Sequence, residues 1–401
     1  MLKGKKILLG VSGGIAAYKA ASLASLLIRQ GCQVSTVMTE NARRIIGAAV
    51  FEALTHRRVY DSAFDRFDPA CIPHIALAEE ADALVIAPAT ADIIAKAVCG
   101  LADDMLSTVI LPCTCPKIVV PAMNTRMYDN AATQENLQTL RRRGWTVMDP
   151  AEGHLACGET GRGKMPEPED IAEFIDVTIG HEKDLQGQKV LVTAGPTCEA
   201  LDPVRYITNH STGRMGYAVA KAAAMRGAEV TLVSGPTVLK TPPLTARVDV
   251  TSAREMFDAV TSRFDASSIV IMSAAVADYR PASVAENKIK KSDGTLELQL
   301  VRTPDILKYL GEHRTHQTIC GFSMETEHLI ENSRAKLAKK HVQIMAANSL
   351  KVPGAGFGTD TNVLTLITAR STVELPLMSK EEAAHCLLDE ILKIRQSAPQ
   401  D

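Results

Sequence analysis

Residues 7–19 read ILLGVSGGIAAYK and decide how the first part of the chain folds. The apolar run at 7–9 predicts a buried strand, the glycines after it predict a tight turn, and the alanine- and leucine-rich stretch that follows predicts a helix. Gly31 is expected to end that helix, and residues 34–38 predict the next strand. The stretch is therefore predicted to form a βαβ unit.

The same alternation continues along the chain. ALVIAPA (83–89), KIVVPAM (117–123) and WTVMDPA (145–151) predict strands, and residues 91–100 predict a helix. Strands that alternate with helices predict a mostly parallel sheet covered on both faces. Residues 153–170, GHLACGETGRGKMPEPED, break the pattern with four glycines and two prolines, which predicts a mobile loop.

The alternation restarts at Lys189 with KVLVTAGPT, and the length of 401 residues suits two domains. We expect domains at 1–188 and 189–401, with the polar stretch 180–189 as the linker. The second domain also contains hairpin signals. Asp293-Gly294 predicts a tight turn, and NVLTLIT followed by VELPL predicts a further antiparallel pair.

Composition excludes several classes of protein. The 44 basic and 46 acidic side chains nearly balance, and aromatic residues make up only 4%, so neither charge nor base stacking favours nucleic-acid binding. No apolar run reaches the ~18 residues that a transmembrane helix needs. The lysines before Ile7 imitate a secretory signal, but a similar unit recurs at Lys189, where no signal could lie.

The nine cysteines are odd in number and scattered, which does not suit a disulfide framework and favours a reducing cytoplasm. Cys113 and Cys115 could suggest a metal site. No second pair or nearby histidine completes four ligands, so buried thiols are the preferred interpretation.

The glycine-rich turn at 10–14 is a candidate phosphate site. A turn between a strand and a helix directs backbone N–H groups and the positive end of the helix dipole at one point. The sequence is neither a Walker A loop nor the dinucleotide fingerprint. Close packing of the helix would also require small residues here, so the turn alone leaves both interpretations open.

Polar groups also follow the predicted strands. His74 precedes the strand at 83–89, PATAD (88–92) follows it, PAMN (121–124) ends another strand, and Cys157 lies in the glycine-rich loop. Ligands of open α/β sheets bind at the carboxyl ends of strands, so these segments are expected to converge on one crevice. Each residue also has a structural explanation, such as a capped histidine, an inert thiol or a turn asparagine.

In this order, GGIAAYK (13–19), Pro73-His74, APATA (87–91), PAMN and ACGETGRGKM (156–165) resemble the FMN-dependent cysteine decarboxylases, specifically the phosphopantothenoylcysteine decarboxylase half of bifunctional coenzyme A biosynthesis enzymes. The second half resembles the phosphopantothenate–cysteine ligase half of the same enzymes. Its matching segments are AGPTCEALDPVRYITNHSTGRMG (194–216), SAAVADY (273–279) and NKIKK (287–291). The resemblance implies an α/β fold with two doubly wound Rossmann-like domains: an N-terminal flavodoxin-like flavoprotein domain and a C-terminal ligase domain with an antiparallel excursion.

For the first half, the resemblance implies FMN as electron acceptor, because no side chain can serve as the electron sink. In such enzymes the substrate thiol is oxidised to a thioaldehyde before CO₂ is lost. By resemblance, His74 assists both steps, Asn124 binds the departing carboxylate, and Cys157 protonates the enethiolate. The residues expected to hold FMN are Gly13, Gly14, Ile15, Ala16, Lys19, Pro88, Ala89, Thr90, Ala122 and Met123.

For the second half, the resemblance implies CTP as a co-substrate that forms an acyl-cytidylate before L-cysteine attacks, with Mg²⁺ on the triphosphate and its ligands unknown. It assigns Lys288 to CTP binding and catalysis, and Asn209 to turnover of the acyl-cytidylate. By composition alone, the lysines at 288–291 suit a solvated edge strand equally well. The residues expected around the nucleotide are Asp278, Lys288, Pro304, Asp305, Ile306, Leu307, Phe322, Lys336 and Lys340.

Independent features agree with this assignment. Residues 211–216, STGRMG, open a predicted helix and form a second candidate anion site, and Lys336 and Lys340 are four residues apart on one helix face. Two residues depart from the family pattern: Asp92 stands where Asn is usual, and Lys164 where Arg is usual.

The resemblance implies a cytoplasmic homo-oligomer in which trimers form around the flavin site and ligase halves dimerise, which together would give a closed assembly such as a dodecamer. The small-molecule substrates would be 4'-phosphopantothenate, L-cysteine and CTP, with no nucleic acid or membrane partner. Two alternatives remain open: a regulatory or peptide-directed flavoprotein of the cysteine decarboxylase family, and a nicotinamide oxidoreductase.

Overall fold

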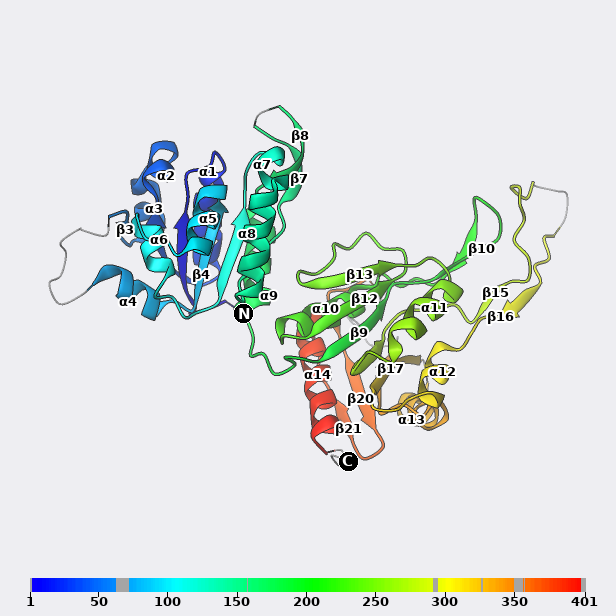
Figure 1. Ribbon diagram of the computed structural model, residues 1–401. Coiled ribbons are helices and arrows are strands. Elements are labelled where there is room, and N and C mark those ends of the chain that lie inside the picture. The colour runs from blue at the N-terminus through cyan, green and yellow to red at the C-terminus, as the bar shows by residue number, and fades with distance from the viewer. Residues whose placement is uncertain are drawn as a thin grey trace. The chain divides into compact units, whose positions relative to one another are not determined.

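The computed structural model describes residues 2–62, 72–156, 158–290, 295–325, 327–349, 356 and 358–397. Cys157 and the predicted Asp293-Gly294 turn lie outside the described residues. The chain forms two compact units that divide between His181 and Glu182. Each unit is an α/β structure built on its own sheet (Figure 1).

The N-terminal unit contains a six-stranded parallel sheet in the order β3-β2-β1-β4-β5-β6. This is a strand order found in doubly wound nucleotide-binding folds, with the change of direction between β1 and β4. The strands are β1 (Lys6–Val11), β2 (Gln33–Met38), β3 (Val59–Tyr60), β4 (Ala83–Ala89), β5 (Lys117–Pro121) and β6 (Thr146–Val147).

Helices cover both faces of this sheet. They are α1 (Ala17–Arg29), α2 (Glu40–Ile45), α3 (Ala48–Thr55), α4 (Pro73–Glu80), α5 (Ala91–Cys99), α6 (Met105–Ile110), α7 (Thr125–Asp129), α8 (Ala131–Arg142) and α9 (Pro168–Ile179). The predicted βαβ unit is confirmed, and α1 ends before Gly31, which has a positive φ of 87°.

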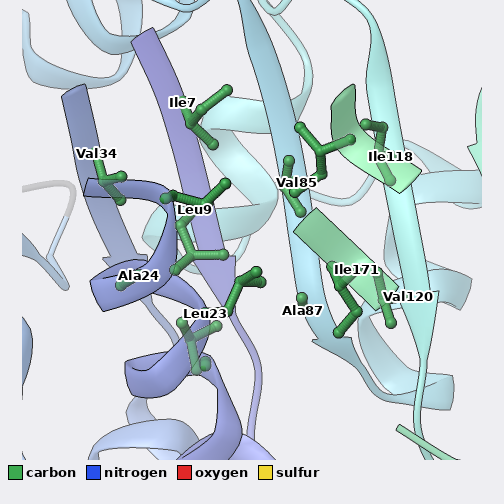
Figure 2. Close-up of a cluster of buried hydrophobic side chains, with 14 of the residues drawn as sticks. Ile7, Leu9, Leu23, Ala24, Val34, Val85, Ala87, Ile118, Val120 and Ile171 are labelled. Atoms are coloured by element: carbon green, nitrogen blue, oxygen red, sulfur yellow. The ribbon is translucent and has the colours of Figure 1, made fainter. Parts of the chain in front are cut away.

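Alternate residues of β1 enter different cores, because successive side chains of a strand point to opposite faces. Ile7 and Leu9 pack against α1 and α9 through residues such as Leu23 and Ile171, as Figure 2 shows. Leu8 packs on the other face, in a cluster with α5, α6 and α8. A strand buried on both faces explains the continuous apolar run in the sequence.

The glycine-rich segment predicted as a mobile loop is a hairpin in the structure. Its two strands, β7 (Ala151–His154) and β8 (Thr160–Lys164), pair antiparallel. Met123 N donates a hydrogen bond of 3.0 Å to Gly163 O, and a Cβ on Gly163 would lie 2.2 Å from Met123 O. The glycine that suggested a loop instead allows the hairpin to approach the end of β5.

The C-terminal unit has an eight-stranded sheet in the order β13-β12-β9-β14-β17-β18-β20-β21, in which only β20 runs against the other strands. The predicted pairing of NVLTLIT with the VELPL segment is confirmed by β20 and β21. The strands of the sheet are β9 (Lys189–Ala194), β12 (Glu229–Ser234), β13 (Thr245–Asp249), β14 (Ile269–Met272), β17 (Thr318–Glu325), β18 (Ile344–Ser349), β20 (Leu364–Thr368) and β21 (Thr372–Glu374).

Short antiparallel pairs and five helices complete the described part of this unit. The pairs are β10 (Cys198–Ala200) with β11 (Tyr206–Thr208), β15 (Tyr279–Pro281) with β16 (Leu300–Arg302), and β19 (Thr361–Asn362) with β22 (Met378–Ser379). The helices are α10 (Arg214–Met225), α11 (Ala253–Phe264), α12 (Ile306–Glu312), α13 (Leu329–Lys340) and α14 (Lys380–Ser397). The expected antiparallel excursion is thus present. Every helix in the described part of the chain is too short or too polar to cross a lipid bilayer.

Part of the segment predicted as a linker belongs to the C-terminal unit, where a buried arginine holds it. Arg226, at the end of α10, is 2% exposed and pairs with Asp184 at 2.5 Å and with Asp389 of α14 at 2.7 Å. Leu185 N also donates to Arg226 O at 2.9 Å. One guanidinium therefore joins three segments that lie far apart in the sequence.

We predict that Arg226→Met lowers the free energy of unfolding of the C-terminal unit by about 3 kcal/mol, because Asp184 and Asp389 lose the cation that compensates them. Hydrogen–deuterium exchange of peptides from α10 and α14 measures this loss. Arg254→Met is the matched control, because Arg254 is exposed and pairs only within α11. Equal exchange in the two variants would contradict the prediction.

Candidate active sites

The glycine turn after β1 is bonded to the end of β4. Ser12 Oγ donates to Pro88 O at 2.7 Å and accepts from Thr90 N at 3.0 Å. A Cβ built on Gly14 would lie 3.4 Å from Thr90 Cγ2 and 3.8 Å from Ala122 O. The turn, PATAD and PAMN therefore converge, as the sequence predicted for the carboxyl ends of these strands.

The end of β5 lies against the same segments. Ala122 N donates to Ala89 O at 3.0 Å, and Met123 lies against β8 through its bond to Gly163. The predicted cofactor residues other than Lys19 thus come from the ends of β4 and β5 and from the turn between β1 and α1.

The turn keeps the donors that an anion needs. In the described part of the chain, the N–H groups of Gly13, Ile15 and Ala16 donate to no acceptor. They precede α1, whose dipole places partial positive charge at the same point. Ile15 is 66% exposed, so the turn is open to ligands. These groups fit the phosphate of a bound flavin nucleotide.

Lys19 points toward α9. Its Nζ lies 2.8 Å from Glu167 Oε1 and donates to Met165 O at 3.3 Å. The hydrogen bond from Lys19 is the main reason that the pKa of Glu167 lies below its usual value, and Lys164 also contributes at 3.5 Å. In this structure Glu167 neutralises the charge of Lys19. The contacts of Lys19 with Met165 and Glu167 connect α1 to the segment that follows β8.

Asn124 already binds a carboxylate. Its Oδ1 caps α7 by accepting from Arg126 N at 2.8 Å, and its Nδ2 donates to Glu159 Oε2 at 3.0 Å. Arg126 Nη2 lies 3.0 Å from the other oxygen of Glu159. The geometry therefore shows that the amide of Asn124 can hold a carboxylate at the end of β5.

His74 lies in the first turn of α4. This helix packs on α6, on the face of the sheet where Leu8 is buried. Its Nδ1 is buried and has no hydrogen-bond partner among the described residues. Within the described part of the chain, His74 forms no hydrogen bond or ion pair with Asn124 or with the glycine turn. A buried ring nitrogen without a partner is uncommon and marks a position where a ligand or another chain can supply one.

One departure from the family pattern has a local explanation. Lys96 lies 3.5 Å from Asp92 and also contacts Asp103 at 2.9 Å and Asp104 at 3.1 Å. Asp92 therefore belongs to an acidic group around one lysine on α5. The carboxylate is compensated there and requires no contact with a cofactor.

The C-terminal unit contains a cavity of about 540 Å³, which we call the nucleotide cavity. All the residues predicted around CTP line it except Lys288: Asp278, Pro304, Asp305, Ile306, Leu307, Phe322, Lys336 and Lys340. They come from four separate parts of the chain, around β15, α12, β17 and α13. These eight residues therefore surround one hollow, and their contact with a nucleotide stays a prediction.

Carboxylates neutralise both lysines of this cavity. Lys336 Nζ lies 2.7 Å from Glu325 Oε1, and Lys340 forms an ion pair with Asp305. Burial raises the pKa of Asp305, but the hydrogen bonds from Lys340 and from Lys308 N outweigh it, so the net pKa is lowered. An incoming triphosphate would replace these carboxylates as the partner of the lysines.

A second cavity of about 190 Å³ adjoins the first, and we call it the α10 cavity. Residues 211–216 at the start of α10 line it together with Asn348 and Lys380. Ala274 and Phe322 line both cavities. Asn209 Nδ2 donates to Ala275 O at 3.0 Å, and Ala275 lines the α10 cavity, so Asn209 lies at its rim.

Lys288 lines neither the nucleotide cavity nor the α10 cavity. It is exposed in the segment between β15 and β16. The next residue, Ile289, is held at both backbone groups: its N donates to Asp202 Oδ2 at 3.1 Å, and its O accepts from Arg205 Nη2 at 2.8 Å. Asp202 and Arg205 were not predicted as site residues, because the polar stretch that contains them indicates a loop and no particular contact.

Asp202 is the centre of that anchor. It is 3% exposed and also accepts from the backbone N–H groups of Val204 and Arg205 at 2.8 Å. Hydrogen bonds from the Arg205 side chain hold the pKa of Asp202 well below its usual range, so it stays ionised at neutral pH.

The described residues contain no group of three or more His, Cys, Asp or Glu that could hold a metal ion. Of the two thiols that the sequence predicted to be buried, Cys113 is buried and Cys115 is half-buried.

Two family models together cover almost the whole chain. Residues 1–180 match the flavoprotein family, and residues 185–394 match the DNA/pantothenate metabolism flavoprotein C-terminal domain. With the fold and the two sets of strand-end sites, this defines a two-domain α/β enzyme whose first domain is a flavoprotein.

Similar proteins carry the same two domains. The coenzyme A biosynthesis bifunctional protein CoaBC of Bacillus subtilis is 46% identical over 98% of this chain and 97% of its own length. The CoaBC proteins of Vibrio cholerae and Escherichia coli K12 are 47% and 44% identical over 96% and 98% of this chain, and over 98% and 97% of their own lengths. The chain belongs to the family of bifunctional coenzyme A biosynthesis proteins, and it is an enzyme with decarboxylase and ligase activities.

Solved structures resemble single halves of the chain. The C-terminal domain of a CoaBC protein is 40% identical, covers 54% of this chain and all of its own, and has a TM-score of 0.47. A variant of PPC decarboxylase in complex with pantothenoylaminoethenethiol is 31% identical, covers 44% of this chain and 98% of its own, and has a TM-score of 0.40.

We predict that Asp202→Asn releases the segment that carries Lys288, because a neutral amide loses the ion pair with Arg205 and one acceptor oxygen. Trypsin should then cleave after Lys288 and Lys290 severalfold faster than in the unmodified chain, as measured by mass spectrometry. Asp249→Asn is the control, since Asp249 is an exposed carboxylate paired with Arg247 on β13. Unchanged cleavage in Asp202→Asn would show that other contacts hold the segment.

Proposed function

We propose that the chain ligates L-cysteine to 4'-phosphopantothenate with CTP through an acyl-cytidylate, and then decarboxylates 4'-phosphopantothenoylcysteine to 4'-phosphopantetheine with FMN. The observation that carries the proposal is the convergence of the predicted nucleotide residues around one cavity that contains two lysines. Family membership supports both activities. The roles of individual residues are part of the proposal.

In the first domain, the glycine turn would hold FMN through its N–H groups, with Pro88, Thr90 and Ala122 against it. When bound, FMN supplies the two-electron oxidation and reduction that decarboxylation of a cysteinyl carboxylate requires. Asn124 orients the substrate carboxylate by exchanging Glu159 for it, a bond of the same type as the one observed. Cys157 donates the proton to the product enethiolate, and His74 assists the earlier proton movements.

In the second domain, the nucleotide cavity binds CTP. Lys336 and Lys340 exchange their carboxylate partners for phosphate oxygens, and Mg²⁺ accompanies the triphosphate and shares its charge. Lys288 stabilises the charge that develops at the α-phosphate during formation of the acyl-cytidylate. Asn209, at the rim of the α10 cavity, acts on the acyl-cytidylate when cysteine attacks.

The α10 cavity takes 4'-phosphopantothenate. The N-terminus of α10 together with Arg214 and Lys380 supplies positive potential for its phosphate. Because Ala274 and Phe322 form a wall common to both cavities, a carboxylate in one can meet the α-phosphate in the other. That adjacency is what formation of an acyl-cytidylate requires.

Assembly would complete both sites. Large apolar side chains are exposed on the antiparallel excursion of the second domain: Val204, Tyr206, Tyr279, Val284, Leu296, Leu298 and Leu300. Such a patch suits an interface between copies of the chain, and the position of Lys288 suits a site in the partner subunit. With trimers through the first domain, these dimers would give a closed homo-oligomer such as a dodecamer. The free cysteines among the described residues suit a reducing cytoplasm.

One assay tests the proposed function. The purified chain should show flavin absorbance and, with CTP, L-cysteine and 4'-phosphopantothenate, should release CMP, pyrophosphate and CO₂. A chain without flavin or without CMP formation would contradict it. The alternative of a purely regulatory flavoprotein predicts flavin absorbance without CO₂ release, and a nicotinamide oxidoreductase predicts oxidation of NADH or NADPH.

We predict that Lys288→Gln abolishes ligation, because the transition state loses a cation. Decarboxylation of supplied 4'-phosphopantothenoylcysteine should stay within about twofold of normal, since that site lies in the other domain. Separate assays of CMP and CO₂ measure the two activities. Loss of both would point to misfolding or failed assembly and would contradict the assigned role.

We predict that Cys157→Ser stops the decarboxylase after CO₂ is released, because a serine hydroxyl is a far weaker acid than the thiol. The dehydrogenated product, which has two hydrogens fewer than 4'-phosphopantetheine, should accumulate and be detectable by mass spectrometry. Cys99→Ser is the control, since Cys99 is an exposed thiol at the end of α5. Formation of normal product by Cys157→Ser would refute the role of Cys157.

A further inference from the structure

The α10 cavity contains a buried acceptor that nothing in the described protein satisfies. Asn348, near the end of β18, is 7% exposed and lines the cavity. Its Oδ1 is buried and has no hydrogen-bond partner among the described residues. Buried polar side-chain atoms are nearly always bonded, so an unpaired amide oxygen in a cavity wall calls for an explanation.

Two other buried polar side chains of this wall are already engaged. Asn362, which is 2% exposed, uses its Oδ1 to accept from Val363 N at 3.0 Å. Lys380, which is 6% exposed, donates from Nζ to Gly356 O at 3.0 Å and to Thr359 O. Asn348 therefore differs from its neighbours in offering an acceptor to whatever fills the cavity.

The charged side chains of the cavity indicate which kind of ligand it can bind. Arg214 and Lys380 both line the cavity, and burial together with the charge of Arg214 lowers the pKa of Lys380. Their counter-charge is Asp360, which pairs with Arg214 at 2.5 Å and has a side chain that is 90% exposed. An anion would be attracted by these cations, whereas Asn348 Oδ1 requires a donor. The cavity thus suits an anion that also carries a hydroxyl or an amide N–H.

We propose that Asn348 is a specificity-determining residue of the ligase site, and that its Oδ1 accepts a hydrogen bond from a hydroxyl or amide N–H of the acyl substrate in the α10 cavity. The inference rests on the proposed function, in which this substrate is 4'-phosphopantothenate. That molecule carries a phosphate, one secondary hydroxyl and one amide N–H, so it meets both requirements.

Asn348→Leu tests the proposal, because leucine branches at the same carbon as asparagine and has no acceptor. The KM for 4'-phosphopantothenate should rise about ten- to hundredfold, the range expected when a donor enters a buried site that has lost its partner. The KM for CTP should stay within about twofold, since Asn348 does not line the nucleotide cavity. Thr365→Val is the matched control, because it removes a buried hydroxyl from the adjacent strand β20 without altering either cavity lining.

Stability provides a readout that a merely structural role would not give. Replacement of an unpaired buried amide by an apolar side chain of the same shape removes a desolvation cost. Without ligand, Asn348→Leu should therefore have a Tm at least as high as the unmodified chain. It should also lose most of the Tm increase that 4'-phosphopantothenate causes in the unmodified chain.

Two analogues of 4'-phosphopantothenate identify the donor. One lacks the secondary hydroxyl, and the other replaces the amide N–H by an ester oxygen. The unmodified chain should bind one of them more weakly than the natural substrate, and Asn348→Leu should not distinguish that analogue from the substrate. Equal penalties in both proteins for both analogues would overturn the proposal.

The outcomes also separate this inference from the proposed function. An unmodified chain that forms no CMP from CTP, L-cysteine and 4'-phosphopantothenate refutes the proposed function itself. An active unmodified chain together with an unchanged KM in Asn348→Leu refutes only the role of Asn348. A rise in the KM for CTP equal to that for 4'-phosphopantothenate would likewise overturn it, because it would indicate a general disturbance of the domain.

Discussion

Both domains depend on the burial of a parallel sheet on its two faces. A strand such as β4 is buried along its whole length, so its side chains are used for packing and none is left for chemistry. Functional groups can appear only where the strand ends and its backbone leaves the sheet. Parallel strands end at the same edge, and for this reason segments far apart in sequence meet there.

This constraint explains which parts of the sites could be predicted from the sequence. Motifs that directly follow apolar runs, such as PATAD and PAMN, are placed by the strands before them, and the structure brings them to the glycine turn. Residues 304–307 and the lysines of α13 could be assigned only by family resemblance. Their common cavity results from the order of β14, β17 and β18, which no local pattern encodes.

Other features depended on contacts that the sequence does not display. The glycine-rich segment became a hairpin because Gly163 lies against the backbone at Met123, and the part of the expected linker after Glu182 became part of a domain because Arg226 is buried beside Asp184. Asp202 and Asn348 gave no signal, since an aspartate in a polar loop and an asparagine in a strand are ordinary. Their significance comes from burial and from the presence or absence of a partner.

The cations of the proposed sites share one electrostatic arrangement. Lys336, Lys340 and Arg214 are each paired with a carboxylate, so an anionic ligand gains only the difference between its own contact and the pair that it replaces. Displaced carboxylates remain near the bound phosphates and repel them unless a further cation intervenes. Mg²⁺ on the triphosphate would supply such a cation in the nucleotide cavity, whereas in the α10 cavity the partner of Arg214 is exposed and can turn into solvent. Because the binding energy is reduced in this way, neutral hydrogen bonds become decisive for selectivity. An acceptor such as Asn348 Oδ1, which is unpaired among the described residues, gives up no such partner when a ligand binds.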